Sequence, residues 1–219
     1  FEAVFFDMDG LMVDSEPEWF LSEVDVTKPF GYTWLESDQI ACLGGPLSRV
    51  GEYMFERCGG AETPHFFTQS LIDTQAAKMR GNTPTMPGAV ELVRQLQSHG
   101  VKTALVSASP RNIVDAVLDN LGHDLFPFSI SSDDVANTKP HPDAYLKAAS
   151  ISDADILNCL IFEDSLTGMK AATSSGAFLI AVPHLVTIEE SARVRVIKSL
   201  EQLSFHKIAQ LHGDFSSAI

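Results

Sequence analysis

Six residues in four separate segments have side chains suited to phosphate chemistry. Each segment lies at or just after a short apolar run, and the residues are Asp7, Asp9, Ser107, Lys139, Glu163 and Asp164. Carboxylates that gather in one place repel one another and raise each other's pKa unless a cation joins them. Oxygen ligands without His or Cys favour a hard ion, and Mg2+ accepts a few carboxylates while leaving room for a phosphate. The set therefore predicts a magnesium and phosphate site.

Asp7 and Asp9 have the spacing for a nucleophile and its proton donor. On an extended segment two residues apart share one face, and Gly10 lets the chain turn directly after them. One carboxylate can attack phosphorus to form an aspartyl-phosphate, while the other moves the proton of the leaving oxygen and then of water. The Ser107 hydroxyl, the Lys139 ammonium and backbone amides at the following helix N-terminus would hold the phosphate. Alone, Asp-x-Asp-Gly is typical of a turn, and its Gly is too early for a calcium loop.

The elements that must bring these residues together alternate along the chain from about residue 85. We expect strands at residues 3–6, 101–106, 128–131, 160–162 and 178–182. We expect helices after Pro87-Gly88, around Ile113 to Leu121, and at residues 143–149 and 165–174. The strands are near-continuous apolar runs, which is typical of a parallel sheet covered by helices on both faces. The carboxyl ends of such strands share one edge, so the polar residues should converge there.

Between the first two expected strands lies a long insert of different character. Residues 15–84 contain helical patches and the breakers Gly44-Gly45-Pro46 and Gly59-Gly60, without strand–helix alternation. We predict an α/β core formed by residues 1–14 and 85–219 and a mostly helical insert at residues 15–84. Beyond Pro183 we expect helical pieces around residues 188–197.

The composition is that of a folded domain with little affinity for polyanions. The chain has 219 residues, of which 45% are hydrophobic and 20% charged. Asp and Glu outnumber Lys and Arg by 29 to 15, a formal charge of -14, so we expect neither nucleic acid nor membranes as partners. The three cysteines have no metal-type spacing, which favours reduced thiols and a cytoplasmic location. The sequence leaves the oligomeric state open.

Four segments in combination resemble the signature motifs of the haloacid dehalogenase superfamily. They are residues 5–16, 106–109, 139–143 and 162–168, and the resemblance covers residues 1 to about 183. It implies a Rossmann-like parallel-sheet core with a small helical cap inserted after the first strand. The cap of this family closes over the substrate.

The resemblance also implies a role for each motif residue. Asp7 would be the nucleophile, and Asp9 the general acid/base and a metal ligand through its carbonyl. The implied phosphate-binding residues are Ser107, Ala108 and Lys139. The implied magnesium ligands are Asp7, Asp9, Asp164 and Glu163, the last directly or through water.

Two features favour a phosphatase within this superfamily. Asp9 favours phosphoryl transfer over dehalogenation, because a dehalogenase has no alkoxide to protonate. The β-phosphoglucomutases carry a cap histidine where this chain has Trp19, and a basic residue where it has Gly44 or Gly45, with Arg49 the nearest cation. A mutase must hold a second phosphate and exclude water, so these differences favour hydrolysis. The run at residues 14–19 resembles phosphosugar phosphatases of the 2-deoxyglucose-6-phosphate phosphatase type, and a mutase remains the alternative.

The expected substrate is a small phosphorylated metabolite such as a sugar phosphate. Cap closure would set the substrate range. The candidate contacts are Trp19, Gly44, Gly45, Arg49, Ser109 and Arg111. Packing between cap and core suits Trp19 equally well, and a solvent position suits Arg111 somewhat better.

A remoter alternative is a phospho-switch resembling a response-regulator receiver. Receivers also use carboxylates, Mg2+, a Ser or Thr and a Lys before Pro. Their acidic pair comes first in the chain, however, whereas here an acidic pair follows Lys139. The insert at residues 15–84 also has no counterpart in that fold.

Overall fold

Six parallel strands form the centre of the molecule. The computed structural model describes residues 1–42, 45–183 and 188–217. The sheet has the order β3-β2-β1-β4-β5-β6, and every neighbouring pair of strands is parallel. The strands are β1 (Ala3–Phe6), β2 (Lys102–Val106), β3 (Ser129–Ile130), β4 (Leu160–Glu163), β5 (Phe178–Ala181) and β6 (Val194–Val196). The predicted Rossmann-like α/β fold is confirmed.

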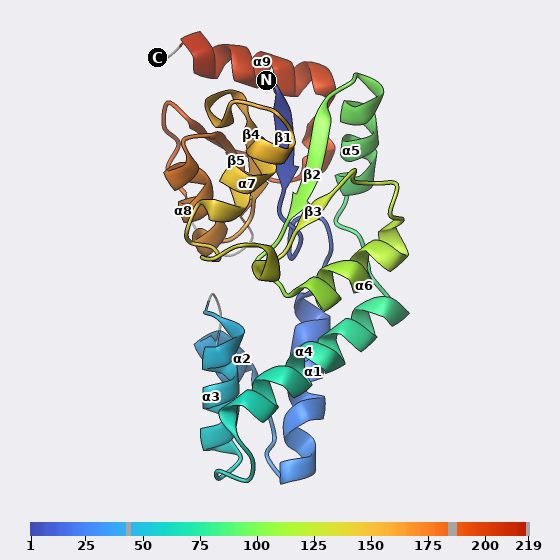
Figure 1. The fold of residues 1–219 in the computed structure, drawn as a ribbon, viewed down its shortest axis with the longest axis vertical. Coiled ribbons are helices and arrows are strands. Elements are labelled where there is room, and N and C mark those ends of the chain that lie inside the picture. Colours follow the sequence, from blue (N-terminus) through green and yellow to red (C-terminus); the bar gives the residue numbers. More distant parts are fainter. Residues whose placement is uncertain (43–44, 184–187, 218–219) are drawn as a thin grey trace.

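Helices cover both faces of this sheet (Figure 1). Val4 and Phe6 pack into one apolar cluster with α5 (Ala89–Ser98), α6 (Arg111–Leu121) and α9 (Phe205–Ser217). Ala3 and Phe5, which alternate with them, pack into a second cluster with α7 (Asp143–Ile151) and α8 (Leu166–Ser175). Because both faces are buried, β1 has no polar position, and Asp7 is the first polar side chain beyond its end.

The insert forms a helical unit beyond the carboxyl end of β1 (Figure 1). Its helices are α1 (Glu16–Thr27), α2 (Glu36–Cys42), α3 (Leu47–Arg57) and α4 (Pro64–Gly81). They enclose their own apolar cluster, which includes Trp34, Met54, Phe67 and Leu71. We call residues 15–84 the cap and the remainder the core. Short 3-10 helices lie at Lys28–Phe30, Ser132–Asp134, Ile156–Asn158 and Leu200–Gln202.

The chain enters and leaves the cap along two adjacent segments. The Asp14 N–H donates to the Pro84 carbonyl over 2.8 Å, and the Met86 N–H donates to the Met12 carbonyl over 2.9 Å. We propose that the two domains meet at this double crossing, which is consistent with boundaries at residues 14 and 84.

The expectation for residues 188–197 is wrong. Residues 188–190 have no regular structure, and Val194–Val196 form the edge strand β6 instead of a helix. Its Val-Arg-Val alternation has the period of a strand, and a charged residue is common on a sheet edge. In the described part of the chain, no helix is both long and apolar enough to cross a membrane.

Candidate active site

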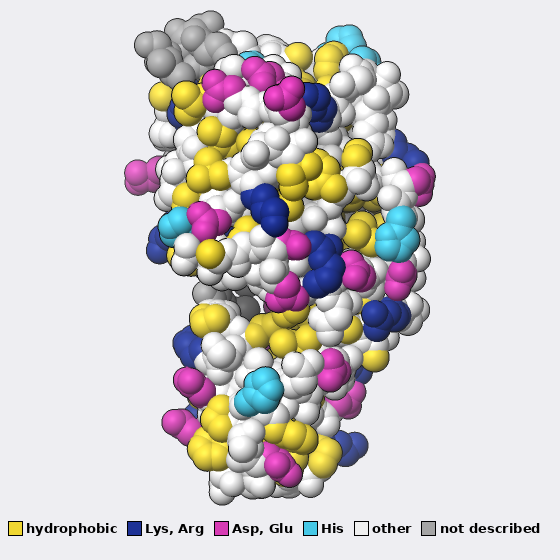
Figure 2. All heavy atoms as spheres, in the orientation of Figure 1, with side chains coloured by type: hydrophobic (Ala, Val, Ile, Leu, Met, Phe, Trp, Pro, Cys, Tyr) yellow, Lys and Arg dark blue, Asp and Glu magenta, His cyan; other side chains and the backbone are white. Residues whose placement is uncertain are grey.

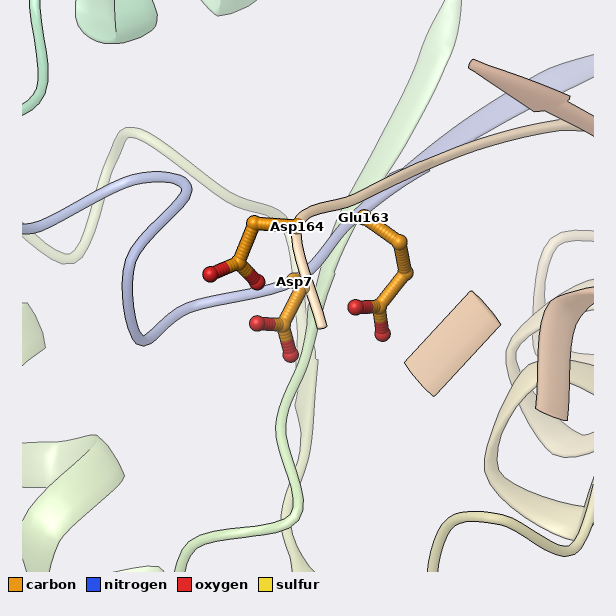
Figure 3. A group of neighbouring side chains, drawn as sticks. All are labelled: Asp7, Glu163 and Asp164. Carbon is orange, nitrogen blue, oxygen red and sulfur yellow. The ribbon is translucent and has the colours of Figure 1, made fainter. Parts of the chain in front are cut away.

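Three carboxylates lie together at the carboxyl edge of the sheet. Asp7 follows β1, Glu163 is the last residue of β4, and Asp164 follows it. One oxygen from each residue lies within 4.8 Å of the others. Figure 3 shows all three carboxylates directed to the same side of the strand ends. The strand register produces this proximity, because Phe6 pairs with Phe162 and the Asp7 N–H donates to the Phe162 carbonyl.

Lys139 supplies a positive charge to this cluster. Its Nζ donates to Glu163 Oε1 over 2.7 Å, to the Val106 carbonyl over 2.8 Å and to Asp7 Oδ1. Only 7% of Lys139 is exposed. Burial alone would lower the pKa of this ammonium, but the charges of Asp7 and Glu163 raise it above its ordinary value. Lys139 therefore stays charged beside Asp7.

Glu163 is the most enclosed member of the cluster. Its side chain is fully buried, and Oε1 accepts a hydrogen bond from the Tyr145 hydroxyl over 2.5 Å as well as the one from Lys139. A Cβ at position 168 would lie 1.9 Å from Glu163 Oε1, so any larger residue there would displace this carboxylate. The predicted metal ligand Glu163 thus bonds to the lysine. Tyr145 is not among the site residues predicted from the sequence; its only sequence signal is its place on the helix that follows the Lys139 loop.

The single positive charge of Lys139 does not neutralise the Asp7 and Asp164 carboxyls as well as that of Glu163. Burial, followed by the neighbouring negative charges, raises the pKa of Asp7 to about 8 and that of Asp164 to about 9. Asp164 Oδ1 is buried and has no hydrogen-bond partner. Gly10 leaves room for this group, since a Cβ at position 10 would lie 2.2 Å from Asp164 Oδ2. An under-neutralised oxygen cluster with an orphaned atom fits a hard divalent cation.

Asp9 lies beside this cluster with its carboxylate held from two directions. Its Oδ1 accepts from the Ser15 hydroxyl over 2.6 Å and from the Trp19 indole N–H over 3.3 Å. Its Oδ2 accepts from the Ser109 hydroxyl over 2.8 Å and lies 3.5 Å from the Ser107 hydroxyl. Ser107 is almost fully buried, and its oxygen also accepts from the Ser109 N–H.

A cleft of about 1120 Å³ opens over these groups. Asp7, Asp9 and Asp164 lie on its core side, together with Ala108, Ser109 and Lys139. The cap contributes Glu16, Gly45, Pro46, Leu47 and Ile72. Figure 2 shows the hollow where the two halves of the molecule meet. The described lining is therefore acidic and cationic at the base and largely apolar on the cap side, with Glu16 as its charged group.

The structure brings only some of the candidate substrate contacts to this cleft. Gly45 and Ser109 line it, and the Arg49 guanidinium lies against Gly45. Gly44 lies outside the described residues. Trp19 does not line the cleft and instead donates to Asp9.

Arg111 also lies away from the described cleft lining. Its guanidinium pairs with Asp134 and Asp115 and donates to Ser129 Oγ over 2.7 Å. Although burial alone would raise it, hydrogen bonds from Ser131 and the Arg111 charge hold the pKa of Asp134 at about 2. These bonds fasten α6 to the loop after β3, a structural role that the spacing alone did not reveal.

The chain belongs to the haloacid dehalogenase-like hydrolase family, whose family model matches residues 1–176. Hexitol phosphatase B of Escherichia coli strain K12 is 30% identical over 184 residues, which cover 83% of each chain. A β-phosphoglucomutase structure from Clostridium difficile covers 99% of both chains with a TM-score of 0.83 and 23% identity, a likeness of fold. A HAD family hydrolase from Deinococcus radiodurans R1, solved with bound phosphate and sodium, has a TM-score of 0.70 and 27% identity over 98% of this chain and 97% of its own. The family predicted from the motifs is confirmed.

Proposed function

We propose that this chain is a magnesium-dependent phosphatase that hydrolyses a small phosphate monoester through an aspartyl-phosphate on Asp7. The observation that carries the proposal is the Asp7 carboxylate at the base of a cleft, between the Lys139 ammonium and the orphaned oxygen of Asp164. Membership of a hydrolase family and the phosphatase named among its relatives support the same reaction.

Asp7 and Asp164 would hold the metal ion, with Glu163 beside them as the counter-charge of Lys139. When bound, Mg2+ would neutralise the carboxylates and the phosphate oxygens, which lets two negative partners approach. Lys139 would bind a phosphate oxygen and orient Asp7, and its charge together with that of the metal ion would favour the ionised form of Asp7. The loop at Ser107 to Ser109 would supply further hydrogen-bond donors to the phosphate.

Asp7 Oδ would then attack phosphorus and displace the ester oxygen, leaving the phosphoryl group on the aspartate. Asp9 would give its proton to the leaving oxygen and afterwards take one from the water that hydrolyses the acyl phosphate. The two carboxylates share this edge of the sheet but have different surroundings. Asp7 contacts a buried lysine, whereas Asp9 contacts hydroxyls and an indole.

We further propose a sugar or polyol monophosphate as the substrate class. The cleft has room for such a molecule, and Lys139 is the only Lys or Arg in its described lining. The cap side offers the Glu16 carboxylate and apolar groups, which suit a hydroxylated remainder better than a second anion. A mutase must hold a second phosphate, so this lining favours hydrolysis, and a relative named for hexitol phosphate hydrolysis agrees with it.

A release assay over phosphorylated sugars, polyols and nucleotides tests the proposal. We expect phosphate release that requires Mg2+, stops with a chelator and is absent in Asp7→Asn. Activity that ignores the chelator, or that persists in Asp7→Asn, would contradict it. Interconversion of hexose phosphates without phosphate release would favour the mutase instead.

A further inference from the structure

We propose that Trp19 is a positioning residue that orients the Asp9 carboxylate through its indole hydrogen bond. The inference rests on the proposed function, in which Asp9 protonates the leaving oxygen. Trp19 lies in the first turn of α1, and its Nε1–H donates to Asp9 Oδ1 over 3.3 Å. Cap residues thereby reach a group that moves protons in the core.

The hydrogen bonds of Asp9 divide by domain. Both donors to Oδ1, Ser15 and Trp19, belong to the start of the cap. The donors near Oδ2, Ser107 and Ser109, belong to the loop after β2 in the core. A carboxylate held by one side alone could rotate about its χ2 torsion, which is broad for aspartate. Held from both sides, it takes one orientation, and that orientation depends on where α1 lies.

Besides its hydrogen bond to Asp9, the Trp19 ring makes apolar packing contacts, and a substitution can separate the two roles. It packs against apolar residues of the core cluster and also of the cap cluster. Replacing Trp19 with Phe keeps an aromatic ring for this packing but removes the N–H donor. The variant therefore distinguishes a positioning role from a purely structural one.

The reaction itself supplies a sensitive readout. Expulsion of an alkoxide from a sugar phosphate requires a proton from Asp9, whereas an aryl leaving group such as para-nitrophenolate departs without one. The ratio kcat/KM covers the steps up to formation of the aspartyl-phosphate, so it excludes the later attack of water. Misorientation of Asp9 should lower kcat/KM for alkyl esters and leave that for aryl esters almost unchanged.

The first test compares Trp19→Phe with wild type on one alkyl and one aryl phosphate. We expect kcat/KM to fall about 10-fold for the alkyl ester and less than about 2-fold for the aryl ester, since general acid help is worth about two to four orders of magnitude in total. Trp34→Phe is the matched control, because Trp34 also donates its indole N–H to a carboxylate, Glu23, but inside the cap. This control should keep the wild-type ratio between the two esters. Equal losses on both esters in Trp19→Phe would overturn the proposal.

The second test needs no activity. The chain has two tryptophans, so a proton–nitrogen correlation NMR spectrum contains two indole signals, which Trp19→Phe and Trp34→Phe assign. Asp9→Ala removes the acceptor, and we expect it to shift the Trp19 signal and leave the Trp34 signal in place. An unmoved Trp19 signal would overturn the proposal. If the wild type hydrolyses neither ester, the proposed function fails, and the NMR result still decides whether Trp19 holds Asp9.

Discussion

The core and the cap each bury carboxylates, but they satisfy them differently. In the cap, Asp38 accepts hydrogen bonds from the hydroxyls of Tyr32 and Tyr53 and from the Leu35 N–H. Although burial alone would raise it, these donors hold the pKa of Asp38 below its ordinary value. In the core, Lys139 pairs with both Asp7 and Glu163, and Asp164 Oδ1 has no hydrogen-bond partner. The pKa of Asp7 rises to about 8 and that of Asp164 to about 9.

This contrast separates a structural carboxylate from one that is suited to chemistry. The hydrogen-bond donors around Asp38 come from the cap itself, so this carboxylate is satisfied without a ligand. The core cluster is left with excess negative charge and an orphaned oxygen on Asp164, an arrangement that costs stability unless a cation neutralises it. Buried carboxylates at a cleft that the protein leaves incompletely neutralised are thus a better sign of function than the presence of acidic residues alone.

The largest expected difference between core and cap is the loss of stability when a paired lysine is removed. Lys139→Ala leaves the buried Asp7 and Glu163 carboxylates unpaired, so we expect it to lower the free energy of unfolding by roughly 3 to 5 kcal/mol. Lys78→Ala, in the cap, breaks a partly exposed pair with Asp25 and should cost less than about 1 kcal/mol. Chemical denaturation in the presence of chelator measures both. Similar costs for the two variants would contradict the contrast.

A smaller effect is expected on substrate preference when the Glu16 charge is removed from the cleft wall. Glu16 lines the cleft, and partial desolvation followed by the charges of Asp9 and Asp14 raises its pKa. Glu16→Gln should improve kcat/KM for a sugar-acid monophosphate, relative to the matching polyol monophosphate, by about 3- to 10-fold, because one repulsion between anions is relieved. Glu18→Gln is the control, since Glu18 lies on the same helix outside the described cleft lining. An unchanged preference in Glu16→Gln would show that Glu16 does not face the substrate.

The smallest effect concerns a buried cap carboxyl with a single described donor. Burial raises the pKa of Glu23 from 4.5 to about 7, although the Trp34 N–H bonds to it. Because the folded state binds this proton more tightly, Glu23 destabilises the fold increasingly as pH rises from about 4.5 to 7. Glu23→Gln keeps an acceptor for Trp34 and should raise Tm at pH 8 by roughly 2 to 4 °C. This gain should shrink as the pH falls towards 4.5.

Thermal unfolding across pH checks this prediction, with Glu52→Gln as the control at an exposed cap position. A loss of stability in Glu23→Gln at pH 8, or a gain that is the same at every pH, would contradict it.

The core of this molecule was predictable because its signals are local. One buried strand ends just before Asp7 and another ends at Glu163, so their parallel pairing places both residues on one edge of the sheet. The strand β6 was mistaken for a helix because three residues are too few for periodicity to decide, and pairing with β5 selects the extended form. The cap helix α4 left little local signal, since it packs against three helices, α1 and α3 in the cap and α6 in the core.

The finer features of the site depend on contacts that spacing does not encode. The Tyr145 hydroxyl reaches Glu163 because α7 packs against the sheet at β1 and β2, next to β4. The Trp19 indole reaches Asp9 because α1 begins shortly after the loop that carries Asp9. The Arg111 side chain turns towards Asp134, which the sequence could not distinguish from a turn towards the cleft. Such pairings join residues through the tertiary fold and become visible only in three dimensions.

The identity of the phosphorylated atom tests the central claim most directly. An aryl phosphate can transfer its phosphoryl group to Asp7 without a proton from Asp9. The Asp9→Ala variant lacks the base that activates water, so hydrolysis of the aspartyl-phosphate should be slow. Rapid acid quenching of this variant after mixing with the aryl phosphate and Mg2+ should therefore trap the aspartyl-phosphate. Mass spectrometry of the digested protein is then expected to find one phosphoryl group on Asp7, and none in Asp7→Asn or with chelator. Phosphate release without any phosphorylated peptide, or a phosphoryl group on a different residue, would contradict the account.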